Sequence, residues 1–337
     1  MLKKPTIKIN LLKILSVIFF FIMLISSTNT KQASINGLNL WLYTIVPTLL
    51  PYFIATNIII YFNAFSSTAK LFHPALRKIF KRSKNGVFPI VCGFICGFPS
   101  GIKTINDLLQ TKKITATEAN YLSIFCNNLS MAFYINIVIL NLFNPNYIIS
   151  THKYGKLFVF LLFILPYLSS VITSKIYLFN HKSDIINLCK QADVDIKKQA
   201  TSIQKSDNVS MNFLDYCISN ALESILKIGG YIILFSIISL LSVKYLQLKG
   251  LASDLCFLIL EISNIEASIN GHSLYLKILM GITLCTFGEF SALFQSLAMI
   301  TSKEISKRNY VKYRIINTFV ALCLAVILCC IMKLSIS

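Results

Sequence analysis

The residues with the clearest chemical potential lie in the sequence Gly-Phe-Pro-Ser-Gly-Ile-Lys, which runs from Gly97 to Lys103. This stretch interrupts an apolar run, because Pro99 lacks an amide proton and disfavours helical dihedrals at the residue before it. Ser100 is then placed to cap a second helical piece, with Gly101 directly after it. We expect the amide groups at the start of that piece, together with the Lys103 ammonium, to bind an anion.

Lys103 has three possible roles. Its position in the first turn of the second piece places a cation near the positive end of a helix dipole, and a bound anion would remove that conflict. The side chain could instead extend to the membrane interface, or pair with Asp107 one turn later.

The elements that hold these residues are predicted to be membrane helices. The chain has 337 residues, of which 55% are hydrophobic and 13% are charged, and several apolar runs approach the length of a bilayer span. We therefore expect an all-α polytopic membrane protein with about eight transmembrane helices plus re-entrant or broken half-helices. The net charge of +19 is explained by basic residues between the apolar runs, where the positive-inside rule places them. No nucleic-acid partner is inferred.

The ten cysteines lie mainly inside apolar runs, and the four histidines are scattered through the connecting segments. This distribution indicates neither a disulfide framework nor a metal site. The sequence also shows no pairing of a nucleophile with a base. We expect no cofactor, no metal and no enzymatic activity.

The chain is predicted to consist of four parts. Basic residues precede the apolar run of the first part, which places the N-terminus in the cytoplasm. The basic stretch at 70–84 is expected to be a cytoplasmic loop for the same reason. The parts are an anchor helix at 1–37, a first repeat at 38–179 with a broken helix at 97–101, a polar cytoplasmic linker at 180–212, and a second repeat at 213–337 with a broken helix at 287–291.

The two repeats are inferred from matching residues and from a matching order of parts. An ungapped shift that places Gly97 on Gly288 also places Ser100 on Ser291. In each half a span is followed by a glycine-interrupted helix, a lysine-rich connector and another span. Interrupted segments in corresponding positions of two halves indicate a transporter's binding site. The sequence leaves open whether the copies are inverted.

Other candidate residues are polar side chains within apolar segments. Ser123, Asn127, Ser130 and Tyr134 recur at helical spacing in a span predicted at 118–143, which would give one polar stripe. Such side chains either donate to a substrate or bond to a neighbouring helix. The complete set of candidate substrate-binding residues is Ser100, Gly101, Lys103, Asn127, Asn128, Ser130, Glu261, Ser291 and Gln295.

Glu261 closes a short apolar segment at 251–262, which is predicted to be re-entrant or a half-helix. A carboxylate within the membrane is costly and commonly functional. Three roles stay open for it: a proton-coupling site, an ion partner of Lys103, or an interfacial residue beside a turn.

From about Leu38 onward the chain resembles the YlbJ-type sporulation integral membrane proteins, which carry a membrane domain of the nucleoside-recognition "gate" type. The chain departs from the family pattern at Ile102 and Glu289, and at Met131-Ala132 after the asparagine motif. The stretches that carry the likeness are 97–103, 118–119, 125–130, 260–262 and 288–295.

The resemblance implies a role in moving dipicolinic acid from the mother cell to the forespore, across the outer forespore membrane of a spore-forming Gram-positive bacterium. Dipicolinate is a flat aromatic dianion, which helix N-termini, a lysine, and amide and hydroxyl donors would suit. Two alternatives remain. A nucleoside would fit contacts with Asn, Gln and Glu side chains, but it would leave Lys103 with a smaller role in binding. A structural protein of the spore envelope membranes would tolerate substitutions in the interrupted helices.

Overall fold

The computed structural model describes residues 6–65, 79–80, 84–151, 154–181, 212–261 and 271–332. Every regular element within these ranges is a helix, which confirms the predicted all-α fold. Five of the described helices are long and apolar enough to cross a membrane. The larger count of about eight stays a prediction. The five are Ser27–Tyr61, Gly155–Asn180, Phe213–Tyr245, Leu274–Met299 and Lys307–Ile331.

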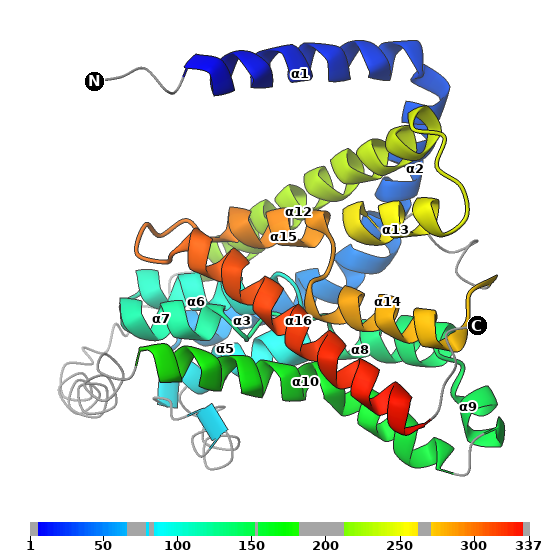
Figure 1. The fold of residues 1–337 in the computed structure, drawn as a ribbon. Coiled ribbons are helices and arrows are strands. Elements are labelled where there is room, and N and C mark those ends of the chain that lie inside the picture. The colour runs from blue at the N-terminus through cyan, green and yellow to red at the C-terminus, as the bar shows by residue number, and fades with distance from the viewer. Residues whose placement is uncertain are drawn as a thin grey trace, which may run out of the picture.

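Helix α1 (Thr6–Ile25) lies along one side of the molecule (Figure 1), and Phe19, Ile22 and Met23 in its second half pack against the apolar cluster that contains Ala33. The chain turns at Ser26 into α2 (Ser27–Asn39), which continues through a π-helical stretch (Leu40–Ile45) into α3 (Val46–Tyr61). Most side chains of α1 from residue 11 onward are apolar and exposed, as they would be in a helix surrounded by acyl chains. Its role as a membrane anchor stays a prediction.

The longest helix, α12 (Asn212–Tyr245), packs along both α2 and α3. Two hydrogen bonds to backbone carbonyls fix this contact. The Ser236 hydroxyl donates to the Ala33 carbonyl at 2.7 Å, and the Trp41 indole donates to the Ile225 carbonyl at 3.0 Å. The start of the chain is therefore held against its second half.

A second group of helices packs around α16 (Lys307–Ile331), which contacts both α10 (Gly155–Asn180) and α14 (Leu274–Thr286). Apolar side chains of these three helices fill one core cluster. A second core cluster lies around α3, α12 and the short helices of the first half, and a small third cluster contains Ala33, Ile237 and Leu241. The remaining described helices are short: α5 (Lys84–Ile95), α6 (Ser100–Gln110), α7 (Ala116–Ser123), α8 (Met131–Phe133), α9 (Pro145–Thr151), α13 (Leu251–Leu260) and α15 (Phe290–Met299).

The predicted continuous span at 118–143 is wrong. Helix α7 ends at Ser123, residues 124–130 are irregular, and helical structure resumes only at α8, which leads into a π-helical stretch (Tyr134–Leu142). The irregular segment lies in close backbone contact with α5 and α6. A Cβ atom at Gly93 or at Gly101 would overlap the Cys126 carbonyl oxygen, so only glycine lets the irregular segment lie there.

Several predictions concern residues outside the described ranges. These are the basic loop, which falls largely within 66–83, and the polar linker, of which 182–211 is not described. The side of the membrane on which the N-terminus lies and the division into repeats also stay predictions.

Candidate binding site at the helix interruptions

The first interruption separates α5 from α6 as predicted, but it covers residues 96–99 rather than 97–101, because Ser100 and Gly101 are the first two residues of α6. Gly97 has a φ of 75°, in the left-handed region that side chains disfavour. A Cβ there would also overlap the backbone of Ser130. The predicted cap is wrong by one position: Pro99 is the N-cap, and Ser100 is the first helical residue with no side-chain cap bond. The proline conformation starts the helix, and the buried Ser100 Oγ has no hydrogen-bond partner.

The second interruption, residues 287–289, separates α14 from α15, also as predicted. Gly288 has a φ of 74°, close to the value at Gly97. The two interruptions also approach each other. A Cβ at Gly288 would lie 3.1 Å from Cε2 of Phe98, which belongs to the first interruption.

The irregular segment 124–130 connects the two interruptions. Its backbone lies against Gly97 and Gly101 on one side. In addition, the Leu129 amide donates to the Cys285 carbonyl of α14 at 3.0 Å. Three non-helical segments therefore meet inside the helical bundle.

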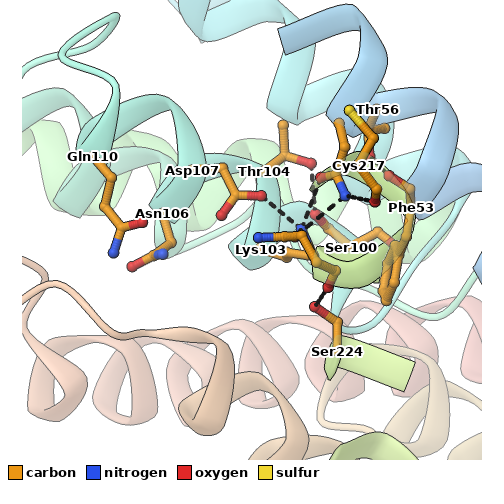
Figure 2. A network of polar contacts seen from close by, with 12 residues as sticks. Phe53, Thr56, Ser100, Lys103, Thr104, Asn106, Asp107, Gln110, Cys217 and Ser224 are labelled. Carbon is orange, nitrogen blue, oxygen red and sulfur yellow. Dashed lines mark hydrogen bonds and ion pairs between the residues drawn. The ribbon is translucent and has the colours of Figure 1, made fainter. Parts of the chain in front are cut away.

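Lys103 is buried, with only 4% of the residue exposed, so its side chain does not extend to an interface. It donates to Asp107 Oδ2 at 2.7 Å, to Asn220 Oδ1 at 2.7 Å and to Asn57 Oδ1 at 3.0 Å (Figure 2). The Phe53 ring lies 5.5 Å from the ammonium. These three acceptors match the three protons of an ammonium, and Asp107 balances its charge. The predicted pairing with Asp107 is therefore present, whereas direct anion binding by Lys103 would require one of these partners to be replaced.

The asparagines of the irregular segment bond to neighbouring helices. Asn127 Nδ2 donates to Ser296 Oγ at 2.9 Å and to the Tyr310 hydroxyl at 2.8 Å. Asn128 Nδ2 donates to Ser170 Oγ at 2.8 Å. Since residues 124–130 are not helical, the predicted polar stripe on one helix face is wrong.

The remaining predicted residues are spread over several elements, and all are buried except Ser130, which is partly exposed. Ser130 is the N-cap of α8, where its Oγ accepts from the Phe133 amide at 3.2 Å. Gln295 Nε2 donates to Ser291 Oγ at 2.9 Å within α15. Glu261, directly after α13, is fully buried, which argues against an interfacial position.

Sequence reasoning missed Arg314. This residue lies in α16 and is 4% exposed. Its Nε donates to the Phe287 carbonyl at 2.8 Å, and its Nη1 donates to the Asn127 carbonyl. The guanidinium carbon lies 3.9 Å from the centroid of the Phe98 ring. Arg314 directly precedes an apolar run in the sequence, and an arginine in that position was the signal that could have identified it.

Comparison with known proteins agrees with this architecture. Residues 42–146 match the family model described as Gate, nucleoside recognition. That range contains the first interruption and the irregular segment 124–130. The second interruption and Arg314 lie outside it. No solved structure matches the chain.

These features define the chain as a multi-pass helical membrane protein with a Gate domain. More particularly, it resembles the YlbJ-type sporulation integral membrane proteins, which confirms the predicted resemblance. It is 28% identical over 249 residues to the sporulation integral membrane protein YlbJ of Bacillus subtilis (strain 168). The match covers 71% of this chain and 59% of that relative.

Proposed function

We propose that the protein is a membrane transporter for a small organic anion, with dipicolinate as the first candidate. In this proposal it acts during sporulation and carries dipicolinate from the mother cell to the forespore across the outer forespore membrane. The similarity to a sporulation integral membrane protein supports a role during sporulation. It does not by itself identify the solute.

The observation that carries the proposal is the meeting of three non-helical segments, 96–99, 124–130 and 287–289, within the helical bundle. Unpaired backbone groups are not tolerated in contact with lipid, so irregular backbone occurs in membrane proteins where protein or a water-filled path surrounds it. Secondary transporters place substrate sites at such interruptions. A protein with only a structural role has no need for two interrupted helices that contact each other.

The preference for an anion follows from the charges near the interruptions. Lys103 lies one turn after the first interruption, and Arg314 contacts both the first and the second. We expect the two buried cations and the N-terminal ends of α6 and α15 to make the electrostatic potential at this place positive. Because Asp107 offsets the charge of Lys103, Arg314 supplies most of the remaining positive charge near the interruptions.

A nucleoside is the second candidate solute, because the matched family model is described as nucleoside recognition. The amide side chains of Asn127 and Gln295 lie near the interruptions and can recognise a base or a ribose. A nucleoside carries no charge that would require a buried guanidinium, which makes this candidate weaker.

The test is uptake by liposomes that contain the purified protein. We expect uptake of labelled dipicolinate above the rate of protein-free liposomes, and no uptake of labelled uridine or adenosine. Uptake of the nucleosides alone would replace the anion proposal with the second candidate. Uptake of none of these solutes, from protein shown to be folded, would contradict a transport function.

A further inference from the structure

Arg314 is a buried cation without a carboxylate partner among the described residues. Only 4% of the residue is exposed, and no ion pair of the described chain includes it. An unpaired charge inside a membrane protein is costly and is normally kept for a function. Lys103 differs in this respect, since Asp107 neutralises it at 2.7 Å.

The guanidinium lies where the three non-helical segments meet. Nε donates to the carbonyl of Phe287 in the second interruption, and Nη1 donates to the carbonyl of Asn127 in the irregular segment. Nη1 also lies 3.3 Å from the Tyr310 hydroxyl. The Phe98 ring of the first interruption covers one face of the guanidinium. All these partners are neutral, so they orient the group without balancing its charge.

One edge of the guanidinium is unused. Nη2 is buried and has no hydrogen-bond partner, and the buried Asn127 Oδ1 also has none. A water molecule could accept a hydrogen bond from Nη2 but would leave the charge unbalanced. A carboxylate supplies both a hydrogen-bond acceptor and the opposite charge, and a charge-assisted bond of this kind is stronger than a neutral one.

We propose that Arg314 is the residue that binds a carboxylate of the transported anion, through Nη2, at the junction of the three segments. This inference rests on the proposed function and identifies its main charged contact. Because Nη2 is buried, the carboxylate reaches it only when the segments separate, so binding is coupled to the conformational change of alternating access. Lys103 then has a structural role, as the partner of Asp107.

The experiment compares four proteins in the same liposomes: wild type, Arg314→Gln, Arg314→Lys and Arg308→Gln. Arg308 is an exposed arginine of the same helix and serves as the matched control. We expect Arg314→Gln to raise the KM for dipicolinate about tenfold or more, since one charge-assisted bond is lost. Arg314→Lys should be intermediate and Arg308→Gln unchanged.

A second ligand separates binding from a merely structural role. The monoamide of dipicolinate has one carboxylate replaced by a neutral amide of similar shape. Wild type should bind the monoamide more weakly than dipicolinate, and Arg314→Gln should lose most of this preference. An equal preference in both proteins would show that Arg314 does not bind the carboxylate, while the transport function would stand. No dipicolinate uptake by folded wild type would instead contradict the proposed function itself.

If the Arg314 variants do not fold, the wild-type protein decides the question. Crystals with a brominated dipicolinate would locate the ligand by its anomalous signal. A peak within contact distance of the Arg314 guanidinium supports the inference. A peak at a different place in the bundle overturns it.

Discussion

The Arg314 guanidinium lies against the Phe98 ring, with 3.9 Å between its central carbon and the ring centroid. Phe98 belongs to the first interrupted helix and Arg314 to the last helix of the chain. This contact brings together two parts of the proposed site that are separated by more than half of the sequence. It also explains why a domain match restricted to residues 42–146 does not include the whole site.

The close backbone contact at Gly101 makes a first prediction. Substitution by alanine would force a Cβ atom against the Cys126 carbonyl oxygen. Overpacking of this kind lowers the free energy of unfolding by about 1–3 kcal/mol. Gly230→Ala is the matched control, because Gly230 has no neighbouring atom within 4 Å of its Cβ position. We expect thermal unfolding in detergent to show a lower Tm for Gly101→Ala only. Equal Tm values would mean that the irregular segment does not lie against Gly101.

The Lys103–Asp107 pair makes a second prediction. Lys103→Ala leaves the Asp107 carboxylate without its cation and should lower the free energy of unfolding by about 2–3 kcal/mol, since breaking a buried pair is costly. We expect that loss to reduce protein levels and spore dipicolinate.

The double variant Lys103→Ala, Asp107→Asn separates structure from binding. Removal of both charges should restore protein levels and dipicolinate uptake in liposomes, if Lys103 serves mainly to hold Asp107 and the neighbouring asparagines. A well-folded double variant without uptake would assign Lys103 a direct contact with the solute.

The Asn128 side chain makes a third prediction. Its hydrogen bond to Ser170 at 2.8 Å joins the irregular segment to α10. Hydrogen bonds between membrane helices are worth about 0.6 kcal/mol on average and up to about 1.7 kcal/mol. A double-mutant cycle of Asn128→Ala and Ser170→Ala, read by unfolding in detergent, should give a coupling energy in that range. A coupling energy of zero would show that this bond contributes nothing to the fold.

The sequence predicted the two glycine interruptions because their cause is local. Gly97 and Gly288 adopt φ values that glycine favours, and Pro99 is the N-cap at which α6 begins. The apolar runs likewise predicted the long helices, since length and composition decide whether a segment can cross a bilayer.

The irregular segment 124–130 could not be predicted in the same way. It contains neither glycine nor proline, and although Asn127, Asn128 and Ser130 are weak helix formers, propensity alone does not exclude a helix there. The segment is irregular where it lies against glycines of α5 and α6, a contact between parts of the chain that are separated in sequence. The importance of Arg314 was missed for a similar reason, because its partners Asn127 and Phe287 lie far from it in sequence.

The most direct measurement of the central claim is dipicolinate uptake by liposomes with wild type, Arg308→Gln and Arg314→Gln. Each protein is first shown to be folded by its Tm in detergent. The account predicts uptake by wild type and Arg308→Gln and a KM about tenfold higher in Arg314→Gln. If none of the three proteins takes up dipicolinate, or if all three have the same KM, the result contradicts an anion site where the helix interruptions meet.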